Sequence, residues 1–170
     1  GFFAINDSIF QGGVNDFSFF GGQLTSSNRV LDVDPQFADP DGADNDILTS
    51  DDNDFSLLAI SPAIDDGDNA GLPVDHLDVD RDADTSETVP FDLVGLARIT
   101  NLDVDLGAIE YCPYNYDGTA PVDMFDVLRF LNDAEANDPA ADLNGSGLPV
   151  DQLDVTEFMN GVESGACNPN

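Results

Sequence analysis

Apolar positions in the last third of the chain recur with a helical period in two places. In both segments apolar side chains stand at positions i, i+3, i+4 and i+7. They are Val127, Phe130, Leu131 and Ala134 in the first segment, and Val155, Phe158, Met159 and Val162 in the second. One apolar stripe on each segment predicts two short amphipathic helices. Because neither helix can bury its stripe alone, we expect the two to pack against each other.

Each predicted helix follows an acidic loop, and loop and helix together form an internal repeat. Residues 115–127 align with residues 142–155, and the second copy carries one extra residue between Ser146 and Val150. The repeating unit is therefore a loop followed by a helix, made twice.

Residues 2–60 show another pattern, in which short apolar runs alternate with turns rich in Gly, Asn and Asp. Long helical periodicity is absent there, so the pattern predicts many short strands joined by tight turns. Residues 5–10 suit one rung of a parallel β-solenoid. A strand of a β-sandwich would look the same, and periodicity leaves both open.

The charge of the chain changes this picture. Its 170 residues, enough for one ordinary domain or two small ones, include four arginines, no lysine and a formal net charge of −31. Asp crowds into the loops, and short carboxylates in turns are the oxygen ligands that calcium prefers. An acidic surface suited to a saline medium would have a similar composition, and the two explanations do not exclude each other.

The same charge excludes some partners. An acidic surface repels phosphate, which argues against nucleic acid and anionic membranes. No apolar run approaches the ~20 residues that span a bilayer. Because the sequence opens in the middle of an apolar run, we expect it to be a C-terminal piece of a longer protein.

The two repeated loops match a calcium loop with ligands at positions 1, 3, 5, 7 (a carbonyl), 9 and 12. The first set is Asn115, Asp117, Thr119, the carbonyl of Pro121, Asp123 and Asp126. The second is Asp142, Asn144, Ser146, a carbonyl of Leu148 or Pro149, Asp151 and Asp154. Ala120 stands where glycine is expected, and the second loop has the extra residue, so we expect two ions bound with unequal affinity. Turn formation alone would explain one such loop, but two copies in register disfavour it.

Residues 71–80 echo residues 147–154, and a third calcium site is conceivable here. Its ligands would be Asp65, Asp66, Asp68, Asp75 and Asp78. No helical stripe follows, which favours a turn-rich loop instead. His76 is the one histidine of the sequence. It could act as a general base, but a solvated loop side chain is the favoured interpretation.

Two cysteines, Cys112 and Cys167, bracket the repeats. Their spacing is not that of a CxxC motif, which argues against zinc and against a thioredoxin-type site. We favour a disulfide over two free thiols, and such a bond implies an oxidising, extracytoplasmic compartment.

The repeated segment resembles the dockerin family. The resemblance rests on the loop-then-helix order, Asp at the last ligand position, and the ending Gly165-Ala-Cys167. It is closest to a Gly-Cys-ending variant found at the C-termini of many secreted bacterial proteins. The resemblance implies that residues 112–170 form a small all-α domain with two EF-hand-like calcium loops. It also implies a cohesin-like or surface-anchoring protein as partner.

Residues 34–37, 61–69, 91–98 and 105–111 together resemble the closing segment of right-handed parallel β-helix surface proteins. This resemblance implies that residues 1–111 are the terminal rungs and closing segment of a pectin-lyase-like β-helix. It also raises carbohydrate as a ligand of that β-helix.

These expectations combine into a function. The chain is expected to be a calcium-binding, non-catalytic region of a secreted or cell-surface bacterial protein, acting in anchoring, sorting or protein–protein docking. The alternative is the accessory tail of an extracellular polysaccharide-degrading enzyme, a lyase or glycoside hydrolase with its catalytic part upstream. Lyases resembling this fold use Arg or Lys as base, but lysine is absent and the arginines are scattered. We expect no catalytic residue in this segment.

Overall fold

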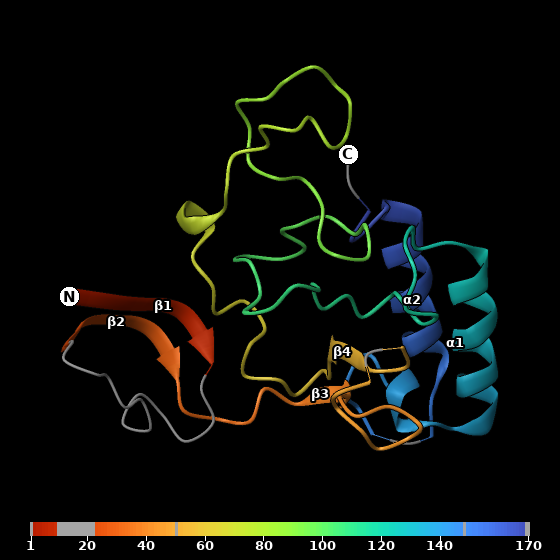
Figure 1. Cartoon of the computed structure of the whole chain (residues 1–170). Helices are drawn as coiled ribbons and strands as arrows, with labels where there is room; N and C mark the ends of the chain where they lie inside the picture. The colour runs from red at the N-terminus through yellow and green to blue at the C-terminus, as the bar shows by residue number, and fades with distance from the viewer. Residues whose placement is uncertain (1, 10–22, 50, 148, 169–170) are drawn as a thin grey trace.

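The computed structural model describes residues 2–9, 23–49, 51–147 and 149–168 (Figure 1). Two strands, β1 (Phe2–Ile9) and β2 (Gln23–Leu31), form a parallel pair. A short antiparallel pair follows, made by β3 (Phe37–Asp39) and β4 (Asp54–Leu57). Figure 1 places the β1–β2 pair at one end, two helices at the other, and long irregular loops between them.

The prediction of a right-handed parallel β-helix is wrong. A β-helix needs strands that pair from rung to rung, but within the described ranges each sheet has two strands and β1 pairs with β2 alone. Beyond β4, side-chain carboxylates accept backbone N–H groups that a β-helix would pair from strand to strand. Asp92 Oδ1, for example, accepts N–H groups from the next turn, at Val94, Gly95 and Leu96. Because such side chains satisfy the backbone locally, the segment folds as loops rather than as strands.

The irregular segment has its own small core. Leu57, Ala63 and Leu106 are buried together, and Phe37 and Tyr111 pack on them. Secondary structure here is limited to the 3₁₀ turn η2 (Asn69–Gly71) and two isolated bridges, 74 to 88 and 91 to 97. This segment is therefore held by a few apolar contacts and by hydrogen bonds to side chains.

Two helices follow, α1 (Met124–Ala136) and α2 (Gln152–Ser164), with a 3₁₀ turn η3 (Pro139–Ala141) between them. Each helix begins with a capping box, built by Asp123 and Asp126 in α1 and by Asp151 and Asp154 in α2. Left-handed residues end both helices, Asn137 after α1 and Gly165 after α2. The two helices predicted from the apolar period are present.

Equivalent residues of the repeat meet in the helical core. Phe130 and Phe158 are fully buried and stack with ring centroids 4.1 Å apart. Tyr116 packs edge-on against both rings. The predicted stripe is only partly buried, because Leu131 and Met159 are each 44% exposed.

The prediction of a separate all-α domain with paired calcium loops is also wrong as a fold class. Outside the two helices, residues 112–168 are mostly loop. Their core is shared, since Leu96 is buried with Cys112, Val122 and Cys167. The Ala97 N–H also donates to the carbonyl of Cys167. Loops of the upstream segment therefore complete the packing of the helical end.

Cys112 and Cys167 form a disulfide in that shared core, where both are buried. It joins the entrance of the repeated segment to its exit, across 55 residues of sequence. None of the described helices is long and apolar enough to cross a membrane.

Candidate metal sites

In the first repeated loop, the last predicted ligand ties the loop to the helix. Asp126 is fully buried, and its Oδ1 accepts the N–H groups of Tyr116 at 2.7 Å and Asp117 at 3.0 Å. Its Oδ2 accepts the N–H of Asp123 at 2.7 Å. One carboxylate thus fixes both ends of the loop.

The second loop repeats this arrangement. Asp154 is fully buried, and its oxygens accept the N–H groups of Asn144 at 3.1 Å and Asp151 at 2.8 Å. The Asp151 N–H holds the pKa of Asp154 below its usual value. Asp142 accepts the N–H groups of Ser146 and Gly147, which wraps the loop around its carboxylate. The sequence repeat is therefore also a repeat of hydrogen bonds.

The other predicted ligands of these loops make different kinds of contact. Thr119 donates its hydroxyl to Asp117, and Pro121 follows a cis peptide bond. Asp123 and Asp151 each accept an N–H from the first turn of their own helix. Leu148 lies outside the described residues.

One predicted ligand has an unsatisfied atom. Asn115 Oδ1 is buried and has no hydrogen-bond partner among the described residues. A buried acceptor without a donor is costly, and a cation would satisfy it. Asn115 occupies the first ligand position of its loop, so this atom fits the predicted metal.

Five carboxylates form two overlapping groups of three in a different part of the chain. Within the described ranges, Asp75, Asp80 and Glu87 form one group and Asp78, Asp80 and Asp82 another. In each group one oxygen per residue lies within 4.8 Å of the others. These acidic groups could hold a metal ion, whereas the carboxylates of the two repeated loops form no such group. We call residues 75–87 the acidic loop.

Backbone pairing brings the ends of the acidic loop together. Val74 and Thr88 form an antiparallel bridge, and the Asp75 N–H donates to the Glu87 carbonyl at 2.8 Å. Asp75 is 1% exposed and accepts the N–H groups of Leu77 and Val79. The turn thus wraps around Asp75, and the bridge sets Glu87 opposite it.

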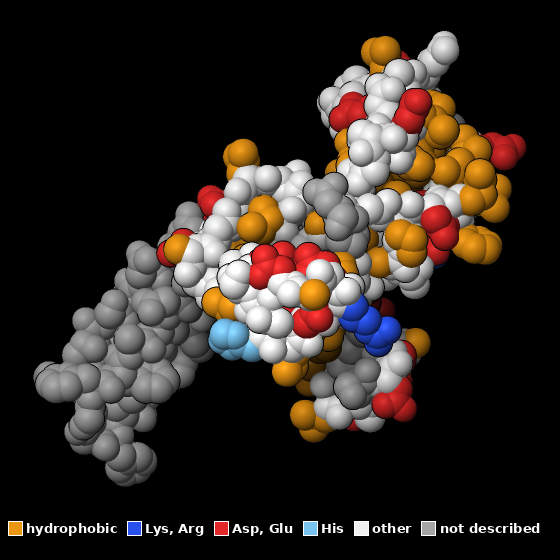
Figure 2. Space-filling model, turned by 90° about the horizontal axis from the view of Figure 1, so that it is seen from above, with side chains coloured by type: hydrophobic (Ala, Val, Ile, Leu, Met, Phe, Trp, Pro, Cys, Tyr) orange, Lys and Arg blue, Asp and Glu red, His pale blue; other side chains and the backbone are white. Residues whose placement is uncertain are grey.

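Glu87 has an unusual environment for a carboxylate. Its Oε1 is buried without a hydrogen-bond partner. Burial raises the pKa of Glu87, and the charges of Asp82 and Asp80 raise it further. A cation in the acidic loop would favour the ionised form and satisfy the unpaired oxygen. Figure 2 shows acidic side chains gathered on one face of the middle of the molecule.

The third site predicted from the sequence is only partly recovered. Asp75 and Asp78 belong to the acidic groups, but the other three predicted ligands lie elsewhere. Asp65 accepts N–H groups of residues 102 and 103, and Asp68 caps η2. Asp80, Asp82 and Glu87 were missed, although Asp at every second position from 78 to 84 was a readable signal. His76 is exposed, as expected for a solvated loop side chain.

A buried acidic network around Glu110 and Asp105 was not predicted from the sequence. Arg98 pairs with Glu110. Burial and then the Asp105 charge raise the pKa of Glu110 to about 8, although Arg98 opposes the shift. Asp105 accepts the N–H groups of Asp65 and Tyr111. This network joins residues far apart in the sequence and is structural.

No protein-family model matches the chain, and no curated protein or solved structure is significantly similar to it. The resemblances drawn from short motifs therefore stay predictions. The site defines a coarse class, a strongly acidic protein whose carboxylate groups could hold a metal ion.

Proposed function

We propose that this chain is a non-catalytic, calcium-binding region of a secreted or cell-surface protein, whose ions stabilise its loops for docking to a protein partner. One observation carries the proposal. Oxygens of Asp75, Asp80 and Glu87 lie within 4.8 Å of one another, and the Glu87 Oε1 has no hydrogen-bond partner.

The chemistry of this group favours calcium. All three ligands are hard carboxylate oxygens, which suit Ca²⁺ and Mg²⁺ rather than metals that prefer nitrogen or sulfur. Calcium accepts six to eight oxygens in irregular geometry, so loop carbonyls and water can complete its shell. Magnesium demands a near-ideal octahedron. An irregular turn with left-handed residues at Asp78, Arg81 and Ala83 suits the more tolerant ion.

Two further ions are proposed for the repeated loops at residues 115–126 and 142–154. The unsatisfied Oδ1 of Asn115 supports the first, and the wrapping of residues 142–147 around Asp142 supports the second. Each loop leads directly into a helix N-terminus. An ion there would fix the loop against its helix, and metal binding would stabilise the fold.

The helical end supports the docking part of the proposal. Met124, Phe125 and Leu128 of α1 are 66%, 67% and 58% exposed. Figure 2 shows hydrophobic side chains gathered over this end of the molecule. Exposed apolar side chains in a cluster are typical of protein contact surfaces. The Cys112–Cys167 disulfide supports an extracellular setting.

The test is a calorimetric titration of the full chain with calcium, after EDTA treatment. Calcium should bind and raise the melting temperature, and magnesium should bind more weakly. Glu87→Gln should weaken one binding event by at least ~10-fold, because a charged ligand is lost. The matched control is Glu163→Gln, which makes the same change at an exposed position of α2 and should bind like the wild type.

A second variant separates the sites. Asp142→Asn should weaken a different event and leave the event lost in Glu87→Gln intact. No heat, together with equal melting temperatures in EDTA and in millimolar calcium, would contradict the proposal. Loss of the same event in both variants would contradict the assignment to separate loops.

A further inference from the structure

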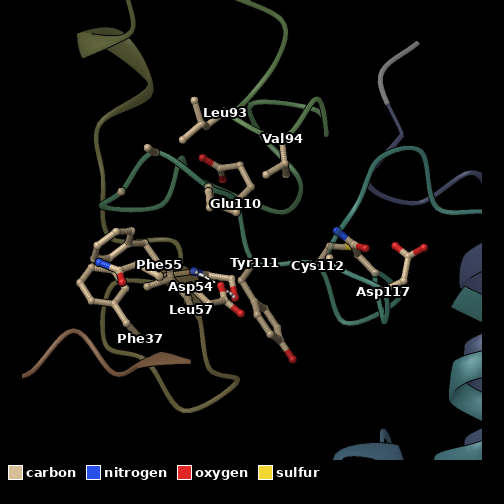
Figure 3. A pocket seen from close by; sticks show the side chains of 17 residues that line it. Phe37, Asp54, Phe55, Leu57, Leu93, Val94, Glu110, Tyr111, Cys112 and Asp117 are labelled. Atoms are coloured by element: carbon tan, nitrogen blue, oxygen red, sulfur yellow. Dashed lines mark hydrogen bonds between the residues drawn. The ribbon is translucent and has the colours of Figure 1, made fainter. Parts of the chain in front are cut away.

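A pocket of about 770 Å³ lies between the β3–β4 pair and residues 93–118. Figure 3 shows Phe37 and Phe55 together on one side of it, and Asp117 on the opposite side beyond Tyr111. The pocket is large enough for a long side chain and the backbone next to it.

Its wall is apolar and partly aromatic. Phe37 and Phe55 meet edge to face with ring centroids 5.6 Å apart, and Leu57 is buried behind them. Phe55 is 41% exposed and Leu93, across the pocket, is 75% exposed. An open aromatic ring facing an open leucine leaves room for a flat group with an apolar stem.

The polar side chains at the pocket present acceptors. Asn53 uses its Nδ2 to donate to the Ile47 carbonyl, which leaves its Oδ1 buried without a partner. Asp54 accepts from Ser56, and Asp117 accepts from Thr119. Glu110 is paired with Arg98. No Lys, Arg or His is among the described residues that line the pocket, so Asp54, which lies outside the proposed calcium sites, has no cationic neighbour in the lining.

We propose that this pocket binds an arginine side chain from a basic segment of a partner protein. A guanidinium is planar, carries five donors and no acceptor, and stacks on aromatic rings. It therefore matches an exposed Phe55, an unsatisfied Asn53 Oδ1 and the Asp54 carboxylate. The stem of arginine fits the apolar wall. The formal net charge of −31 would attract such a segment.

Other occupants match less well. Anionic ligands meet two carboxylates. A neutral sugar needs donors as well as acceptors, and the side chains here supply mainly acceptors. A lysine ammonium is more strongly hydrated and cannot stack as a plane. Phe55, Asn53 and Asp54 lie outside the proposed calcium sites, so the inference rests on these three residues and not on Asn115 or Asp117, the predicted calcium ligands that also line the pocket.

The test uses the full chain and a fluorescent pentapeptide, Gly-Arg-Leu-Arg-Gly, blocked at both ends. Fluorescence polarisation is measured at about 0.15 M salt, where the Debye length of about 8 Å suppresses long-range attraction. The same peptide with citrulline for arginine is the ligand control, because citrulline keeps the shape and loses the charge. The arginine peptide should bind at least ~10-fold more tightly, as expected for loss of a charge-assisted hydrogen bond.

Two variants locate the binding. Asp54→Asn should weaken it by ~3- to 10-fold, whereas Glu163→Gln, with the same change in net charge, should leave it unchanged. Phe55→Leu should weaken it by roughly 3-fold through loss of the cation–π contact. Circular dichroism checks that the variants fold, which the exposure of both side chains favours.

Peptide binding is measured both in EDTA and in calcium. Equal binding of the arginine and citrulline peptides would overturn the proposal. Equal effects of Asp54→Asn and Glu163→Gln would also overturn it, since they would indicate attraction by net charge alone. Binding of cellotetraose in the pocket, with no binding of the arginine peptide, would replace it with a carbohydrate site. Peptide binding in EDTA without any calcium heat would support the pocket and reject the metal sites.

Discussion

The helical end and the irregular segment of residues 58–111 use the same side chain, aspartate, in two different ways. In the helical end, Asp126 and Asp154 act at helix N-termini, where capping joins them to regular structure and to an aromatic core. In the irregular segment, Asp92 and Asp105 are bonded to the backbone across loops with little regular structure. Stability is therefore expected to depend on apolar burial in the first region and on carboxylate–amide hydrogen bonds in the second.

The largest effect is expected from Phe158→Ala. Phe158 is fully buried and stacks on Phe130, so truncation removes apolar contact and leaves a cavity at the centre of the helical end. The free energy of unfolding should fall by ~3–5 kcal/mol, measured by urea denaturation. Phe125→Ala is the control, because Phe125 is 67% exposed and should cost little.

The comparison also predicts which region Phe158→Ala destabilises most. Amide exchange should accelerate in α1 and α2 more than around Asp92, because Phe158 lies in the apolar cluster of the helices and not in the Leu96 cluster that the two regions share. Equal losses for the buried and the exposed phenylalanine would show that the aromatic stack does not hold this region.

A smaller but still large effect is expected from Asp92→Ala. Asp92 Oδ1 accepts three N–H groups of its own turn, and Oδ2 accepts the Glu110 N–H at 2.9 Å. Removing the carboxylate leaves several donors in a partly buried place, and unfolding should become easier by ~2–4 kcal/mol. Asp84→Ala is the control, since Asp84 is exposed and its carboxylate accepts hydrogen bonds from its near neighbour Ser86. If both variants unfold at the same urea concentration, hydrogen bonds between carboxylates and the backbone do not stabilise this segment.

The same contrast explains how far the sequence could be interpreted. The helices were predictable because a 3.6-residue period, present in two copies with Asp before each, is visible within a short stretch of sequence. Packing of the two helices against each other was expected from that repeat, but the stacking of Phe130 on Phe158 was not predicted. The β-helix was predicted wrongly because short apolar runs and turn motifs are compatible with several folds, and nothing local shows which strands pair.

The candidate sites divide in the same way. The capping roles of Asp126 and Asp154 lay within the repeated motif, although metal ligation was the role assigned to them. The acidic loop depends on the bridge between Val74 and Thr88, which brings Glu87 to Asp75 from twelve residues away. The pocket depends on contacts between β4 and residues 93–118. Neither contact has a periodic signal, so sequence alone could not place them.

The last expected effect is a change in the pH dependence of stability. The pKa of Glu110 is about 8 in the folded chain because of burial, against an ordinary value of 4.5. Between these values the folded state holds a proton that the unfolded state has released. This group's contribution to stability is therefore full below about pH 4.5, falls as the pH rises, and is lost above about pH 8.

Glu110→Gln tests that slope, because glutamine keeps the shape of the side chain and does not titrate. The free energy of unfolding of the wild type, minus that of the variant, should decrease steadily from pH 5 to pH 8 in urea denaturation. The other carboxylates titrate in both proteins and largely cancel in the difference. A difference that stays constant, or rises with pH, would mean that Arg98 keeps Glu110 ionised throughout. The irregular segment would then be stabilised by a permanent ion pair. The interactions that stabilise it would differ even more from the neutral aromatic packing of the helical end.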